Sequence, residues 1–308
     1  MEYEEFCTLG TIQAYPECPD EVKANHIESM NRLCPDGNID EDMIAGMYWP
    51  DRIDGSSVEG IDRLQQYDNI DRVMITGLRQ DTFEYFVKTF GHKISCINFD
   101  GNKSVTDLSP LSALTGVRYI RFGLNYRVTA LWDMTSNHNL EGLALTGFTK
   151  LHSLEGVQAA PNLQHLRWGG EMWDTSTLTD LRPLIHTTLV SFGFFGKKIE
   201  DNDVSVFAKI PTLRILDTAL NFYTTEELAQ IVALCPHVSG RALAPYEKIG
   251  DIEEIEKIGL GGNVYICGKR KPVLHAIKDA AKIEEYVARF NELVEHYRRR
   301  SEISRSGD

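Results

Sequence analysis

The sequence predicts an α/β solenoid in which short parallel strands form an inner sheet and short helices or extended turns form the outer side. Three observations predict it: a recurring apolar motif, a regular spacing between its copies, and amphipathic segments at both ends of the repeated region. The chain has 308 residues, of which 42% are hydrophobic and 25% are charged. These proportions are typical of a globular protein, so they exclude collagen-like, low-complexity and wholly disordered chains.

The recurring motif is an apolar residue, two spacers, an apolar residue, one spacer and a third apolar residue. Successive copies begin at Ile70, Ile94, Val117, Leu140, Leu163, Leu189 and, more weakly, Leu213. The first residues of these copies are 24, 23, 23, 23, 26 and 24 positions apart, inside the period of roughly 20 to 29 residues that is typical of leucine-rich repeats. Less regular copies at Ile44 and Val238 are expected to be terminal ones, because end repeats cap the stack.

The second half of each repeat predicts the same fold. Asn102, Asn125 and Asn221 occupy the ninth position of their copies, where a buried amide can satisfy backbone groups as the chain leaves the strand. The segments at 105–111 and 178–184 read VTDLSPL and LTDLRPL. They resemble the internalin-type, bacterial class of leucine-rich repeat, whose units read like ITDISPL. This resemblance implies a right-handed, horseshoe-shaped solenoid that serves as a binding module.

Three regions are predicted along the chain. Residues 1–43 are expected to form an acidic helical N-terminal cap, residues 44–245 the leucine-rich repeats, and residues 246–308 a C-terminal cap with a long helix. Apolar residues at helical spacing, between 20 and 34 and again from Pro272 onward, predict the capping helices. Caps are needed because a terminal repeat would otherwise expose its apolar edge.

The charge is concentrated at one end of the chain. The formal net charge is -13, and residues 1–69 hold 16 Asp and Glu against 4 Lys and Arg. A negative field of this kind disfavours nucleic acid and anionic membrane as partners. The acidic start, the lack of a long apolar stretch and six cysteines without close pairing predict a cytoplasmic protein with reduced thiols and no bound metal or other cofactor.

The inner face offers one candidate binding site. Spacers of successive strands are expected to line up in rows, and the strand at 140 exposes only Gly142, Ala144 and Thr146. Larger side chains flank this small floor, with Arg121 on one side and Arg167 on the other. At about 4.8 Å per strand they would stand roughly 10 Å apart, close enough to bracket one carboxylate or phosphate. The alternative is that these long side chains simply point into water.

Seven residues are predicted to line the binding surface: Arg72, Tyr119, Arg121, His165, Arg167, Trp173 and Phe195. Trp173 belongs to a loop with four extra residues, which is expected to project from one rim, where an exposed tryptophan can anchor a partner. The alternative for Trp173 is that it folds back over the adjacent loop.

No motif in the chain predicts catalysis. The phosphate-binding loop, the metalloprotease motif and the serine-hydrolase motif are missing. Cys96 and His165 share a row, but they lie three strands apart, about 14 Å, which is too far for a nucleophile and its base. The chain is therefore predicted not to be an enzyme.

The function predicted is noncovalent recognition of a partner protein through the inner face of a monomer. One alternative is an enzyme whose active site lies in a cap and whose repeats recognise the substrate. The other is an inhibitor or immunity protein whose acidic first 69 residues neutralise a basic partner.

Overall fold

The computed structural model describes the chain from residue 53 to residue 306 apart from four short segments: 68–69, 71, 171–174 and 258–260. The predicted N-terminal cap, the motif copy at Ile44 and Trp173 lie outside the described residues. The chain forms two compact units. The first holds the described residues up to His152 together with Ala159–His165, and the second holds Ser153–Gln158 and the residues from Leu166 onward.

Eight strands form a sheet of order β1-β2-β3-β4-β5-β6-β8-β10. Their bounds are β1 Ile53–Asp54, β2 Arg72–Thr76, β3 Cys96–Asp100, β4 Tyr119–Gly123, β5 Gly142–Thr146, β6 His165–Trp168, β8 Ser191–Phe194 and β10 Ile215–Thr218. The pairs from β1 to β5 in the first unit and the pair β8 and β10 in the second are parallel. Each strand from β2 onward in this sheet begins two residues after the start of a predicted motif copy and contains its second and third apolar positions, so the motif predicted the strands correctly.

A shared carbonyl marks the start of the strands. The carbonyl oxygen of Ser95 accepts hydrogen bonds from the amides of Arg118 and Tyr119, at 2.7 and 3.1 Å. One repeat later, the carbonyl of Arg118 accepts in the same way from the amides of Glu141 and the residue after it, at 2.8 and 3.0 Å. The carbonyl of Val190 repeats the pattern in the second unit. Each repeat therefore sets the position at which the next strand begins.

A row of stacked aromatic rings fills the core of the first unit. Helix α5 (Gln80–Phe90) contributes Phe83, whose ring lies edge-on to Phe99 with 5.5 Å between centroids. Phe99 stacks on Phe122 at 5.0 Å, and Phe122 lies 5.5 Å from Phe148. All four rings are fully buried. Because each ring belongs to a different repeat, the core is continuous through the stack, as expected for repeats that cannot bury an apolar face alone.

Buried amides hold the turns that follow the strands. The side-chain nitrogen of Asn125 donates to the carbonyls of Asn102 and Val105, both at 2.9 Å. Its side-chain oxygen accepts from the amides of Arg127 and Val128, also at 2.9 Å. Asn102 and Asn125 are completely buried, so the predicted role of the ninth position is confirmed for both. With this ladder and the stacked core, the chain folds as a leucine-rich-repeat solenoid.

The prediction is wrong for Asn221, which is exposed. The chain there turns directly into helix α6 (Thr225–Leu234), whose first turn is capped by its own side chains, so no amide is needed. A buried amide that the motif did not predict is Asn137, which donates to the carbonyls of Leu111 and Leu114 at 2.9 and 3.1 Å. The ladder is therefore continued by side chains at more than one position of the repeat.

The outer segments are mostly single turns, as predicted. They are α4 Val58–Asp62, η1 Arg63–Gln66, α5, η2 Gly91–Lys93, η3 Ser109–Ala113, η4 Val157–Ala159, η5 Arg182–His186, η6 Val204–Lys209 and α6. In the second unit two short strands, β7 (Thr177–Asp180) and β9 (Lys198–Asp201), pair in parallel between repeats. A proline lies in the first turn of η3 and of η5, where its fixed φ favours a helical start.

The C-terminal segment begins as a sheet and ends as a helix. Its elements are β11 Tyr246–Lys248, α7 Ile252–Lys257, β12 Val264–Ile266, β13 Val273–Leu274 and α8 Ala280–Ser306. Strand β12 lies between β11 and β13 in a three-stranded sheet. The predicted start of the long helix at Pro272 is wrong, because Val273 and Leu274 instead pair antiparallel with β12 and extend the small sheet.

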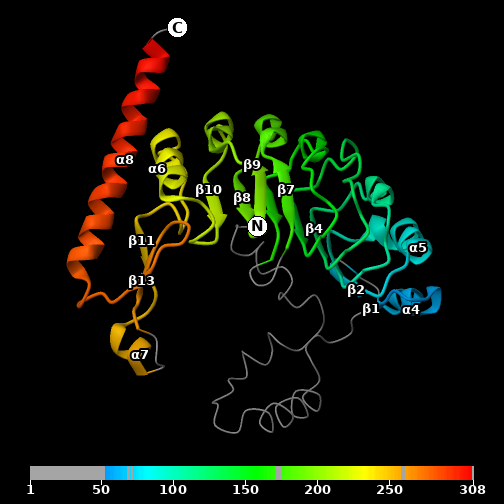
Figure 1. The fold of residues 1–308 in the computed structure, drawn as a ribbon. Helices are drawn as coiled ribbons and strands as arrows, with labels where there is room; N and C mark the ends of the chain where they lie inside the picture. The colour runs from blue at the N-terminus through cyan, green and yellow to red at the C-terminus, as the bar shows by residue number, and fades with distance from the viewer. Residues whose placement is uncertain (1–52, 68–69, 71, 171–174, 258–260, 307–308) are drawn as a thin grey trace. The chain divides into compact units, whose positions relative to one another are not determined.

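Helix α8 lies alongside α6 (Figure 1). Phe290 and Val294 are buried on α8, with 4% and 6% of their surface exposed. Arg289 adds an ion pair to Glu226 of α6 at 3.4 Å. The helix therefore packs against the helix of the last repeat, at the end of the stack, where the apolar edge of a terminal repeat needs cover.

The two asparagines at the same position of their repeats offer a matched test of the ladder. Asn125→Ala should lower the free energy of unfolding by more than about 2 kcal/mol, because it leaves one buried amide, one partly buried amide and two buried carbonyls without partners. Asn221→Ala should change it by less than about 0.5 kcal/mol, because that side chain is exposed. Urea unfolding measures both, and equal effects would contradict the ladder.

Candidate binding surface

The register of the first unit confirms the predicted rows of the inner face. Arg72 lies opposite Cys96, Cys96 opposite Tyr119, and Tyr119 opposite Gly142. Arg121 belongs to the next row, one pleat further along β4. Cys96 and Tyr119 are buried, with 7% and 4% of their surface exposed. These two side chains of the inner face are therefore largely inaccessible to water.

The predicted floor residues lie on β5 in the predicted register, and Ala144 lies directly opposite Arg121 on β4. Gly142 and Ala144 are buried, however, and not exposed as the sequence predicted, because larger neighbouring side chains cover these small residues. The amide of His165 donates to the carbonyl of Glu141 at 2.9 Å, so His165 begins the following strand in the row of Gly142. Arg121 is partly exposed, whereas only 6% of His165 is exposed. The small residues Gly142 and Ala144 therefore lie between Tyr119 and Arg121 on one side and His165 on the other.

The sequence did not predict a polar network at the entrance to β4 and β5. Arg118 donates from Nε and Nη2 to the two carboxylate oxygens of Glu141, at 2.9 and 2.8 Å. The hydroxyl of Tyr119 donates to the same carboxylate, and the Arg118 guanidinium lies 5.3 Å from the centre of the Tyr119 ring. The hydrogen bonds from Arg118 are the main reason that the pKa of the Glu141 carboxyl lies below its usual value. The network therefore ties the Tyr119 side chain to the next repeat.

The spacing of Arg118 and Glu141 could have revealed this network. They are 23 residues apart, one repeat length, and therefore face each other across adjacent repeats. Opposite charges that recur at the repeat period are the signal to look for in such a chain.

In the second unit, Arg167 forms an ion pair with Asp217, with 3.5 Å between Nη1 and Oδ2. The guanidinium also lies over the ring of Phe195, 4.2 Å from its centre. Only 10% of the Arg167 side chain and 24% of the Asp217 side chain are exposed. Arg167 is therefore held by groups of its own unit, and this favours a structural role for it.

Gly193 explains how Arg167 reaches its partner. Asp217 lies opposite Gly193 across the pair β8 and β10, and β8 separates β10 from β6 in the strand order. Because Gly193 has no side chain, the arginine can extend over it to the carboxylate. The row Arg167, Gly193, Asp217 can be read from the motif spacing, so the pair could have been predicted.

The predicted bracket of Arg121 and Arg167 spans the two units, since Arg121 belongs to the first and Arg167 to the second. The separation of the two guanidinium groups therefore stays a prediction, and so does the role of Trp173.

The described residues show no catalytic constellation. Cys96, Cys235 and Cys267 are buried and form no disulfide, and burial raises the pKa of Cys235 and of Cys267 to about 11. Thiols of this kind are poor nucleophiles at neutral pH. Within the described part of the chain, no three His, Cys, Asp or Glu side chains are placed to hold a metal ion. No described helix is both long and apolar enough to cross a membrane.

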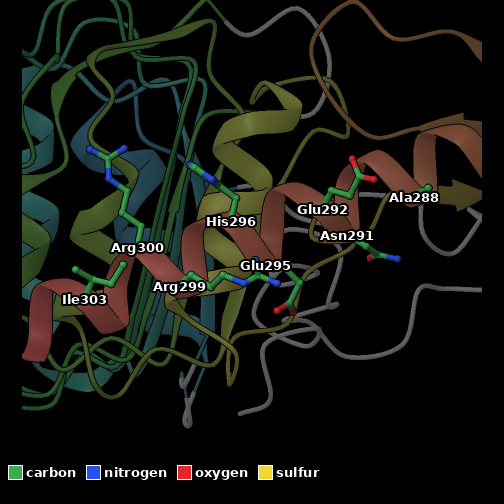
Figure 2. Close-up of a pocket in the computed structure, with 8 residues that line it drawn as sticks. All are labelled: Ala288, Asn291, Glu292, Glu295, His296, Arg299, Arg300 and Ile303. Carbon is green, nitrogen blue, oxygen red and sulfur yellow. The ribbon is translucent and has the colours of Figure 1, made fainter.

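A shallow hollow of about 770 Å³ runs along α8 (Figure 2). Its lining residues all come from this helix: Ala288, Asn291, Glu292, Glu295, His296, Arg299, Arg300 and Ile303. Figure 2 shows Glu292, His296 and Arg300 projecting from one side of the helix, one turn apart. The lining carries charges of both signs, so this face does not select an anion or a cation.

Comparison with solved structures finds similar folds at low sequence identity. An internalin C2 from Listeria monocytogenes is 17% identical and has a TM-score of 0.39, with 63% of this chain and 84% of that chain covered. An internalin (inlF) from the same species is 17% identical with a TM-score of 0.38, over 66% of this chain and 74% of that one. A leucine-rich-repeat protein of Leptospira interrogans is 13% identical with a TM-score of 0.38, over 67% and 57%. No protein-family model and no curated protein sequence matches the chain.

Removing the partner of Arg167 tests its structural role. Asp217→Asn should lower the free energy of unfolding by about 1 to 3 kcal/mol, because it leaves a largely buried guanidinium without its counter-charge. Asp201→Asn is the matched control, since Asp201 is exposed on β9 and should change stability by less than about 0.5 kcal/mol. Equal effects of the two substitutions in denaturant unfolding would show that Arg167 does not depend on Asp217.

Proposed function

We propose that this chain is a noncovalent protein-binding module that recognises its partner through the inner face of the repeats. The observation that carries the proposal is the floor of Gly142 and Ala144 beside Tyr119, Arg121 and His165. We call the surface around these residues the recess. Its partly exposed Arg121 can form several hydrogen bonds with a partner, and arginine is enriched where binding energy concentrates, whereas Tyr119 is already buried and borders the surface.

The chemistry of the recess favours an acidic group on the partner. Arg121 carries a permanent positive charge, and part of its side chain is exposed beside the apolar floor. A carboxylate that enters beside Ala144 would be shielded from water, which strengthens charge-assisted hydrogen bonds. The net charge of -13 would at the same time repel acidic partners that lack a matching shape.

The remaining predicted residues extend this surface. Arg72 lies two strands from Tyr119 in the same row, and Arg167 with Phe195 forms a rigid wall in the second unit. We further propose that Trp173 lies on the rim of this surface and anchors the partner there. Within this proposal the module acts as a monomer in the cytoplasm and uses no cofactor, nucleic acid or membrane.

One alternative rests on a specific observation. The first 69 residues carry most of the net negative charge, which suits an inhibitor or immunity protein that neutralises a basic partner. Such a complex would weaken steeply with salt and would not depend on Arg121.

Paired pull-downs from native lysate test the proposal, with wild type, Arg121→Glu and Arg127→Glu as baits. Arg127 is the matched control, because it follows the same strand and is exposed on the loop. Arg121→Glu should weaken capture of the specific partner by more than about 2 kcal/mol, or roughly 30-fold in Kd, because an attraction becomes a repulsion inside the recess. Arg127→Glu should bind as wild type.

Titration of the purified partner against each bait then gives the affinities. Equal binding by wild type and Arg121→Glu would contradict the proposed surface. If that equal binding also falls steeply with salt, the acidic N-terminal region is the binding element instead.

A further inference from the structure

A polar pocket of about 380 Å³ opens in the second unit, between the loop after β8 and the loop before α6. We call it the lysine pocket, and its lining is Gly196, Lys197, Lys198, Ile199, Asn202, Ala219, Asn221, Phe222, Thr224, Glu227 and Lys269. It contains none of the residues assigned to the inner-face surface. Three segments that are far apart in the sequence meet there.

The pocket concentrates positive charge in an acidic protein. Lys197, Lys198 and Lys269 line it, against Glu227 as the single acidic residue. Lys198 has a long, exposed ion pair to Glu200, 3.9 Å between the charged atoms. Within the part of the chain that the structure describes, neither Lys197 nor Lys269 forms an ion pair. Like charges gathered in this way repel each other unless an anion joins them.

Hydrogen bonds within the fold hold the carboxylate of Glu227 in place. One carboxylate oxygen accepts the amide of Thr224 at 2.7 Å, and the other accepts the side-chain amide of Asn202 at 2.9 Å. The hydroxyl of Thr224 accepts the amide of Glu227 in return, at 3.1 Å. This capping box closes the start of α6. The start of α6 is therefore not the anion site. The Glu227 carboxylate offsets one of the three lysines, which leaves the pocket lining with a formal net charge of +2 (three Lys minus one Glu).

The backbone holds Lys269 in place. Its amide donates to the carbonyl of Tyr223 at 2.7 Å, and the amide of Gly268 donates to the carbonyl of Leu220 at 2.8 Å. Gly268 has φ +128, and a Cβ there would lie 2.7 Å from Oγ1 of Thr225, so only glycine fits this close approach. The turn fixes the backbone of Lys269, so little backbone entropy is lost there when a ligand binds.

The neighbouring basic residue at the end of this turn has a different role. The ammonium group of Lys271 lies 5.3 Å from the centre of the Tyr286 ring on α8. The run of three basic residues at 269–271 is therefore not one continuous patch, because Lys269 lines the pocket and Lys271 contacts α8.

We propose that the lysine pocket binds a small oxyanion that carries two or more negative charges. Three ammonium groups supply the charge, and the exposed amide of Asn221 adds a hydrogen-bond donor to the same lining. The volume lies at the lower end of the range of about 300 to 1,000 Å³ for small-molecule sites, which suits a small ligand rather than a polymer. A polyphosphate and a polycarboxylate share this chemistry.

Isothermal titration calorimetry of the full chain tests the proposal. Pyrophosphate and citrate are the two ligands, each at matched ionic strength in chloride. Wild type should bind at least one of the two anions. A double variant that combines Lys197→Ala and Lys269→Ala should bind at least about tenfold more weakly, because two of the three lysine charges are lost. The matched control is Lys93→Ala with Lys150→Ala, which removes the same charge from exposed positions of the first unit and should leave binding unchanged.

The two anions distinguish a phosphate ligand from a carboxylate ligand. Binding of pyrophosphate alone would indicate a phosphate ligand, and binding of citrate alone would indicate a carboxylate ligand. Circular dichroism without anion should show that both variants keep the wild-type melting temperature. No binding of either anion by wild type would overturn the proposal. So would equal binding by wild type and the pocket variant, or equal weakening in the pocket and control variants.

Discussion

The stack depends on carbonyl groups that each accept two amides of the next repeat. The oxygens of Ser95, Arg118, Glu141 and Val190 all do so at the start of a strand. A single repeat cannot bury its apolar edge, so it is stable only when a neighbour lies at the correct height. The shared carbonyl fixes that height, and with it the choice of residues that point into the core or toward the inner face. A slip of one residue would exchange the two sets.

The motif spacing predicted the strands because their apolar residues alternate with inner-face residues over a constant period. It also predicted that Asn102 and Asn125 are buried. It failed at Asn221, where the chain enters α6 and no longer needs a side-chain amide. It failed again at Pro272, because the helical spacing of apolar residues does not show that Val273 and Leu274 have a strand partner in β12. Local patterns report periodicity, whereas these two outcomes depend on which neighbour is present.

The candidate surface was predictable in its rows and less so in its interactions. The rows follow from the register, which the structure shows between Arg72 and Gly142. To predict the ion pair of Arg167 with Asp217, one must also ask which carboxylate a buried arginine can reach. Gly193 lies between the two and has no side chain, so the arginine can extend over it. The lysine pocket could not be predicted, because Lys269 reaches it only through the turn that docks the C-terminal segment on Tyr223.

The central claim is that neighbouring residues of one strand serve separate purposes, one holding the stack and the next facing the partner. Ile120 and Arg121 on β4 test it most directly, because Ile120 is completely buried and Arg121 is partly exposed on the inner face. Denaturant unfolding of the two alanine variants gives the comparison. We expect Ile120→Ala to lower the free energy of unfolding by about 2 to 5 kcal/mol and Arg121→Ala by less than about 1 kcal/mol. A loss of equal size in both variants would contradict the account.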